Sequence, residues 1–139
     1  MKLTKCLLLL VALGVPFAAG ADDDWFRGRL FPPEIVLRNA TALKLTDAQR
    51  KTIRTEIVKV QTAVAGVDVE LMEEGLAMQE AIDKSPIDRN TVLTHAENVF
   101  AAESRKKRAW IEMLINIKNA LTPAQIDSLR SITGTETKP

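Results

Sequence analysis

The side chains best suited to chemistry in this sequence are a single histidine, His95, and a single cysteine, Cys6. A histidine can bind a transition metal or transfer a proton near neutral pH, and a cysteine thiolate can act as a nucleophile. If His95 lies on a helix, the residues three and four positions away from it are Thr91, Val92, Asn98 and Val99. None of these is a good transition-metal ligand, so we interpret His95 as a solvated or packing residue.

Other residue patterns that support catalysis are missing from the sequence. His95 has no serine or acidic partner at the spacing of a known motif, and no glycine-rich phosphate-binding loop is present. Carboxylate pairs such as Glu73-Glu74 are common on exposed helices. The acidic run Asp22–Asp24 lacks the spaced oxygen ligands of a calcium-binding loop. We therefore expect a protein that is not an enzyme and that holds no metal and no cofactor.

Basic residues interleaved with apolar ones indicate a binding surface instead. The densest cluster is the basic run 105–108, which lies between Phe100 and Trp110. A charge run is usually a solvated helix face. However, cationic side chains beside apolar ones can attract acidic, partly unfolded client proteins and then hold them. The candidate client-binding residues are Arg50, Lys51, Arg54, Ile57, Arg105, Lys107, Arg108 and Met113.

The N-terminal 21 residues have the layout of a secretory signal peptide. Two lysines precede an apolar run over residues 6–13, and small residues follow up to Ala21. The run is well short of the roughly 20 residues that span a bilayer. Residues 19–21 read Ala-Gly-Ala, which fits a cleavage site. We expect cleavage near Ala21 and a periplasmic protein, with a retained membrane anchor as the alternative.

Composition limits what the exported chain can be. Cleavage would remove two of the 19 lysines and arginines and none of the 18 acidic residues, so the formal net charge would move from +1 to −1. This balance argues against a nucleic-acid-binding protein. The only cysteine would leave with the signal peptide, so packing and not disulfides must stabilise the fold. The remaining length suits a single domain.

Apolar residues beyond the signal peptide follow helical spacing and show no strand-like alternation, so we expect an all-α fold. From Ile53 they recur in steps of four and three, and a second such series begins at Val92. Either Ser85 or Asp88 caps the second long helix. The expected elements are an extended arm over residues 22–33, one all-helical domain over 34–133 with helices at 34–43, 47–83, 89–120 and 123–133, and a disordered tail over 134–139.

The two long helices are expected to fold back on each other as an antiparallel hairpin, with the short helices flanking it. Val64 then faces Trp110. Lys106 falls on the same seam, where it either snorkels to solvent or pairs with Asp68 or Glu103. Apolar residues outside the seam need cover from the terminal helices, a second subunit or a client.

Two copies of Leu-Thr-x-x-Gln flank the predicted hairpin, at residues 45–49 and 121–125. In each copy the threonine can cap the following helix while the glutamine accepts a hydrogen bond from the backbone of the cap residue, which is the capping-box arrangement. We therefore expect the motif residues to be fold markers and not binding residues. They are Leu45, Thr46, Gln49, Leu121, Thr122 and Gln125.

These two motifs, in a helical hairpin behind a signal peptide, resemble the LTxxQ family of periplasmic proteins, which includes Spy- and CpxP-type chaperones and zinc- or nickel-responsive sensors. The resemblance covers about residues 33–133. It implies a four-helix fold and a cradle-shaped antiparallel homodimer, whose concave face holds partly folded clients in the chaperone members. The metal-sensing branch needs clustered ligands, and a sequence with one histidine departs from it.

The leading prediction is therefore an ATP-independent periplasmic chaperone that binds unfolded or stressed envelope proteins and forms a homodimer. The alternative is a regulatory protein that docks on a membrane sensor and reports envelope or metal stress. Metal buffering is a weaker third interpretation, because the ligand count is low. A chaperone would bind many unrelated chains weakly, whereas a regulator would bind one partner.

Overall fold

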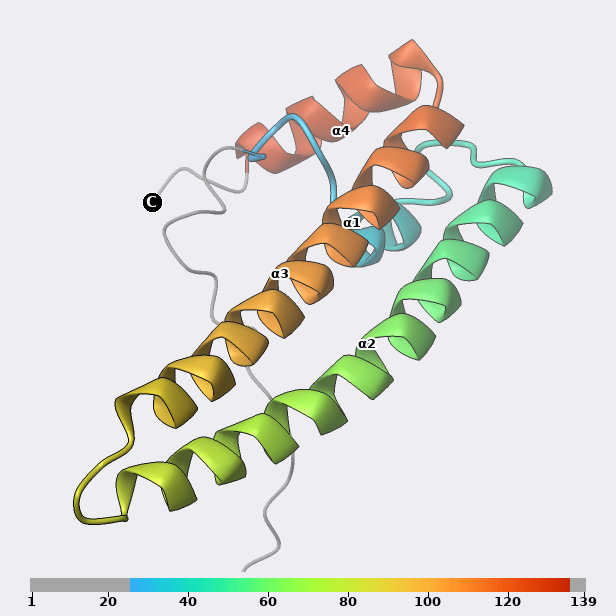
Figure 1. The fold of residues 1–139 in the computed structure, drawn as a ribbon. Helices are drawn as coiled ribbons and strands as arrows, with labels where there is room; N and C mark the ends of the chain where they lie inside the picture. The colour runs from blue at the N-terminus through green and yellow to red at the C-terminus, as the bar shows by residue number, and fades with distance from the viewer. Residues whose placement is uncertain (1–25, 136–139) are drawn as a thin grey trace, which may run out of the picture.

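The computed structural model describes residues 26–135, and that part of the chain contains four helices and no strand (Figure 1). The helices are α1 (Pro33–Arg38), α2 (Asp47–Ile82), α3 (Arg89–Ala120) and α4 (Pro123–Thr135). Helices α2 and α3 lie antiparallel, and α1 and α4 lie at the end of this hairpin that is farther from its turn (Figure 1). The all-α hairpin predicted from the apolar spacing is confirmed.

Side-chain caps set where the long helices begin. Thr46 Oγ1 accepts a hydrogen bond from the Gln49 backbone N–H at 3.1 Å, and Gln49 Oε1 accepts one from the Thr46 backbone N–H at 3.0 Å. The predicted capping box of α2 is therefore present. Asp88 caps α3 by accepting from two backbone N–H groups in the first turn. Of the two residues that could cap this helix, the structure thus selects Asp88 over Ser85.

The first short helix ends earlier than predicted. Helix α1 stops at Arg38 and does not reach Leu43. The Asn39 side chain donates a hydrogen bond to the Ile35 carbonyl at 2.9 Å, beside the one that the Asn39 backbone N–H donates to the same carbonyl at 3.2 Å. The chain then turns, and Lys44 adopts a left-handed φ of 50° immediately before the α2 motif. A right-handed helix cannot include that conformation, so α1 and α2 are separate helices joined by this turn.

The expected extended arm also differs where the structure describes it. Residues 26–30 form a turn in which the Leu30 backbone N–H donates to the Phe26 carbonyl at 2.8 Å, and Phe31 is only 2% exposed. Burial of this ring draws the segment onto the domain, since a solvated arm would leave a large apolar surface in water. Helix α4 includes Gly134, where the tail was expected to begin. The predicted signal peptide, residues 22–25 and residues 136–139 lie outside the described residues.

A hydrophobic core lies at the end of the hairpin where all four helices meet, which we call the base. Each large side chain that is fully buried there contributes about 1.5–3 kcal/mol relative to exposure. This core fixes α1 and α4 on the hairpin and so positions both Leu-Thr-x-x-Gln motifs. Its buried members are Phe31, Val36, Ala40, Leu43, Leu45, Ile53, Met113, Leu114, Ile117, Leu121 and Leu129.

The part of the hairpin over residues 65–108, which we call the distal half, is held differently. Ala81 and Ala102 are the buried apolar residues in this range. Lys106 Nζ lies 2.6 Å from Asp68 Oδ1 on the opposite helix. Of the three arrangements predicted for Lys106, the structure therefore has the pair with Asp68. The predicted hairpin register places these two residues at the same level. Ion pairs and half-buried apolar side chains join the helices here, in place of a closed core.

Candidate functional site

The glutamines of the two Leu-Thr-x-x-Gln motifs are hydrogen-bonded to each other. Gln49 Nε2 lies 2.8 Å from Gln125 Oε1, and Gln125 Nε2 lies 3.1 Å from Gln49 Oε1. Each amide nitrogen also donates to a carbonyl that precedes the other motif, Gln49 to Ala120 at 2.8 Å and Gln125 to Leu43 at 3.0 Å. Each amide oxygen still accepts from the backbone N–H of its own cap residue. We call this arrangement the glutamine clasp.

The clasp explains why the motif carries glutamine. A capping box alone accepts either glutamate or glutamine at this position. Each clasp residue must donate and accept at once, which an amide can do and an ionised carboxylate cannot. Thr122 caps α4 in the predicted way, by accepting from the Gln125 backbone N–H at 3.3 Å. All the amide atoms are engaged within the protein, so the motif ties the starts of α2 and α4 together and presents no free group to a ligand.

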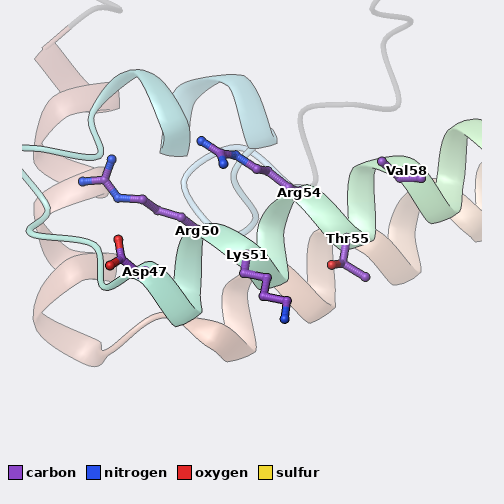
Figure 2. A pocket seen from close by; sticks show the side chains of 6 residues that line it. All are labelled: Asp47, Arg50, Lys51, Arg54, Thr55 and Val58. Atoms are coloured by element: carbon purple, nitrogen blue, oxygen red, sulfur yellow. The ribbon is translucent and has the colours of Figure 1, made fainter.

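The first group of candidate client-binding residues lies on α2 beside the clasp. An open hollow of about 640 Å³ is lined by Asp47, Arg50, Lys51, Arg54, Thr55 and Val58 (Figure 2). Figure 2 shows Arg50 and Arg54 extending to one side of α2, whereas Lys51 points to the other side. Arg50 Nε donates to the Leu45 carbonyl at 3.3 Å. Within the described part of the chain, neither Lys51 nor Arg54 has an ion-pair partner.

The second group, in the basic run 105–108, is largely paired. Arg105 forms an ion pair with Glu70 across the hairpin. Arg108 pairs with Glu112 one turn later on α3, at 3.0 Å. Exposed pairs of this kind contribute only about 0–1 kcal/mol each, but they occupy the cations. Lys107 differs from the rest of the run, because it forms no ion pair with any residue from 26 to 135.

The structure does not bring the eight candidate residues together. The Lys106–Asp68 pair sets the level of the basic run, which is about 20 Å along α2 from Arg54 at 1.5 Å per residue. Ile57 is half-buried against the core, and Met113 is 2% exposed within it. Met113 therefore offers no surface to a client, which corrects its assignment. Its heptad position points into the seam between α2 and α3, where the terminal helices α1 and α4 cover it. Local spacing does not reveal that these helices lie there.

Exposed apolar side chains gather on the outer faces of the hairpin instead. On α2 they include Val58, Val69, Met72 and Leu76. On α3, Phe100 is 64% exposed and Leu93 is 43% exposed. Residues seven apart share a helix face, so Lys107 continues the row that Leu93 and Phe100 begin. We call these three residues the α3 outer stripe. A heptad count on the face away from the hairpin seam is the sequence signal that identifies it.

His95 has a partner on the opposite helix. Its Nδ1 lies 2.7 Å from Glu74 Oε2, and both side chains are half-buried. Hydrogen bonds from His95 and from Asn98 lower the pKa of Glu74 below its ordinary value of 4.5. The neighbours of His95 on its own helix give no hint of this pair, because the hairpin register supplies the carboxylate. Among residues 26–135, no group of three histidine, cysteine or acidic side chains is placed to hold a metal ion.

A hairpin whose two Leu-Thr-x-x-Gln motifs are bonded to each other defines an LTxxQ-type protein, related to the Spy and CpxP proteins. The heavy-metal resistance family matches residues 6–128, which is most of the chain, and the protein belongs to this family. Proteins of the family are typically periplasmic. No curated protein and no solved structure matches the chain significantly. Within the described residues, no helix combines the length and apolarity that a membrane span requires.

Proposed function

We propose that this protein is a periplasmic chaperone that works without ATP and binds partly unfolded envelope proteins. The observation that carries the proposal is the exposure of Phe100 in the α3 outer stripe. Single exposed apolar residues are ordinary on soluble proteins. Phe100 is not single, because Leu93 precedes it and Lys107 follows it at the same spacing, and Lys107 has no ion-pair partner among residues 26–135. A row of this kind on an open helix face favours binding of another chain.

The stripe combines the two kinds of side chain that capture of an unfolded chain requires. Lys107 attracts acidic segments over a range of about 8 Å at physiological ionic strength. Phe100 and Leu93 then remove apolar client residues from water, at about 25 cal/mol per Å² buried. Few side chains take part, so each complex is weak and depends little on the amino-acid sequence of the client. Broad, reversible binding is what protection of many different clients needs.

The proposal has three further parts. The signal peptide over residues 1–21 directs export, so the chaperone meets its clients in the periplasm. The protein is not an enzyme and needs neither a metal nor a cofactor, so the free energy of binding alone protects the client. Lys107 is the cation of the basic run on which client attraction rests, because its neighbours Arg105 and Arg108 are held in ion pairs.

The family match favours a second candidate, a regulatory protein that docks on a membrane sensor and reports metal or envelope stress. Membership of a heavy-metal resistance family is the observation in its favour. The two candidates differ in breadth, since a chaperone binds many unrelated clients and a regulator binds one sensor.

Light scattering of a chemically denatured, unrelated enzyme diluted into buffer tests the proposal. With no ATP and with a chelator present, near-stoichiometric amounts of the purified protein should suppress the scattering. Phe100→Ser should weaken the suppression several-fold. Ile87→Ser is the matched control, because Ile87 is 57% exposed in the turn and lies off the stripe. If the wild-type protein is helical by circular dichroism and still gives no suppression, the regulatory candidate replaces the chaperone.

A further inference from the structure

The charges on α2 are divided between its two ends. Residues 47–59 contain four basic residues and two acidic ones, whereas residues 60–82 contain five acidic residues and no basic one. This is the reverse of the order that suits a helix, because the partial charges at its ends favour acidic side chains near the N-terminus and basic ones near the C-terminus. Helix stability therefore does not explain where these charges lie.

The cations at the start of α2 lie around one hollow and are not neutralised there. Arg50, Lys51 and Arg54 line the open hollow beside the glutamine clasp (Figure 2). None of the three has an ion-pair partner among residues 26–135, although Asp47 lines the same hollow. Arg50 and Arg54 are four residues apart on one helix face, where like charges repel each other. An anion from outside the chain would relieve that repulsion.

The basic residues of α3 are treated differently. Arg105, Lys106 and Arg108 each form an ion pair with an acidic side chain of α2 or α3. In the hollow, by contrast, the one restraint on a cation is a hydrogen bond that leaves its charge open. Arg50 Nε donates to the Leu45 carbonyl, and the two terminal nitrogens of this guanidinium stay available to a ligand. Arg50 is thus positioned and still able to bind an anion.

We infer that the α2 hollow binds the phosphate groups of anionic lipids, so that the protein attaches to a membrane surface from the periplasmic side. Guanidinium groups suit phosphate because they donate two parallel hydrogen bonds to it. Each lysine or arginine held near an anionic bilayer adds to the attraction. The inference uses the periplasmic location of the proposed function and does not use client binding.

The geometry of the hollow favours a charged surface over a single small anion. Figure 2 shows Arg50 and Arg54 extending to one side of α2 and Lys51 to the other, so the three cations do not converge on one point. Lipid phosphates are spread over a plane, and a plane can meet side chains on both flanks of a helix that lies against it. An unfolded acidic peptide fits less well, because Thr55 and Val58 offer it little apolar surface between the cations.

The division of charge also sets how the hairpin is oriented on the membrane. An anionic surface attracts the basic start of α2 and repels the acidic residues beyond it. The base should therefore lie toward the lipid, with the turn between α2 and α3 directed away from it. The α3 outer stripe shares no residue with the hollow, so Leu93 and Phe100 stay available to clients in the attached protein.

Co-sedimentation of the purified exported protein with lipid vesicles, with no client present, tests the inference. The protein should bind vesicles that contain phosphatidylglycerol and not vesicles of phosphatidylcholine alone, and added salt should release it. The double variant Lys51→Gln/Arg54→Gln should lower the partition coefficient about thirtyfold. Both side chains are exposed, so the fold should persist by circular dichroism. The control Lys84→Gln/Arg89→Gln removes the same charge at the hairpin turn and should change the coefficient by less than about twofold.

A fluorescent label tests the orientation independently. The one cysteine of the sequence lies in the proposed signal peptide, so Thr55→Cys or Ile87→Cys gives the exported chain a single site for the label. Vesicles that contain phosphatidylglycerol should protect the label on Thr55→Cys from quenching by acrylamide several-fold. They should leave the label on Ile87→Cys unprotected, because the turn is at the other end of the hairpin.

Several results would overturn the inference. One is a wild-type protein that does not bind these vesicles, including one that binds inorganic phosphate by calorimetry and still ignores lipid. Another is an equal loss of binding in the two double variants, since the attraction would then follow net charge and not the hollow. Equal protection of the two labels would contradict the orientation. None of these results depends on whether the protein suppresses aggregation.

Discussion

The base and the distal half of the hairpin bury their apolar side chains to different extents. Four helices meet at the base, whereas α2 and α3 run side by side alone in the distal half. At the base, Val36, Ile53 and Ile117 have no exposed surface. In the distal half, the fully buried residues are alanines, seam residues such as Leu71 and Val99 are half-buried, and other large apolar side chains are exposed. The base therefore buries its large apolar side chains within a single chain. The distal half leaves several large apolar side chains exposed to solvent.

This difference indicates how stability and binding are divided along one pair of helices. The free energy of folding is concentrated where the core and the glutamine clasp hold all four helices together. The distal half extends from the base as two long helices whose outer faces carry exposed apolar residues. The core and the glutamine clasp share no side chains with the outer faces of the distal half. A substitution in one region can therefore leave the other intact. The predictions below test that separation, from the largest expected effect to the smallest.

Truncation of a base residue should cost far more stability than truncation of a distal one. Ile117→Ala should lower the free energy of unfolding by about 2–5 kcal/mol, because it leaves a cavity in the core. Phe100→Ala removes a larger side chain from an exposed site and should change it by less than about 0.5 kcal/mol. Urea unfolding followed by circular dichroism measures both. Equal losses would mean that the distal half contains a core after all.

The clasp should not tolerate glutamate in place of either glutamine. Gln125→Glu keeps the cap acceptor but loses both donors, and it turns a carboxylate toward the Gln49 amide oxygen and the Leu43 carbonyl. We expect a loss of about 1–3 kcal/mol at neutral pH, measured by urea unfolding. Gln61→Glu, on an exposed part of α2, is the matched control. The deficit should shrink in acid, because a protonated glutamate recovers one donor. A loss that stays constant with pH would argue against the clasp.

The His95–Glu74 pair should make the distal half sensitive to acid. The pKa of Glu74 lies below its ordinary value of 4.5 in the folded protein, chiefly because His95 is hydrogen-bonded to the carboxylate. A lowered folded-state pKa means that the pair stabilises the fold above pH 4.5, and that this contribution is lost as the pH falls through the lowered pKa. Thermal unfolding between pH 6 and pH 3 should therefore depend less on pH in Glu74→Gln than in the wild type. Glu73→Gln, its exposed neighbour, should behave like the wild type.

The smallest effect is expected at Lys106, where the distal seam carries a charge. Lys106→Met replaces a half-exposed ion pair with an apolar side chain on the seam. The change should be neutral or stabilising by up to about 1 kcal/mol, because apolar packing often replaces such a pair without loss. Urea unfolding measures it. A loss above 1 kcal/mol would show that the Asp68 pair holds the two helices together in the distal half.

The sequence by itself determined the helices and their starts. The capping box at Thr46 and Gln49, the cap at Asp88 and the apolar steps from Ile53 are local signals, because each depends on residues within a turn or two of one helix. The register of the hairpin followed as well, since a short turn between two seams leaves one way to align them. Those signals predicted the α2 and α3 bounds to within a residue.

The tertiary structure decided which of these local features meet across the fold. The bond between Gln49 and Gln125 joins residues that lie far apart in the chain, and the spacing within either motif is fully explained without it. The pair between His95 and Glu74 and the burial of Met113 likewise depend on what the opposing elements place at that level. Local spacing fixes the face of a helix on which a side chain lies. Packing of the other elements decides whether that face is covered, paired or left open to bind.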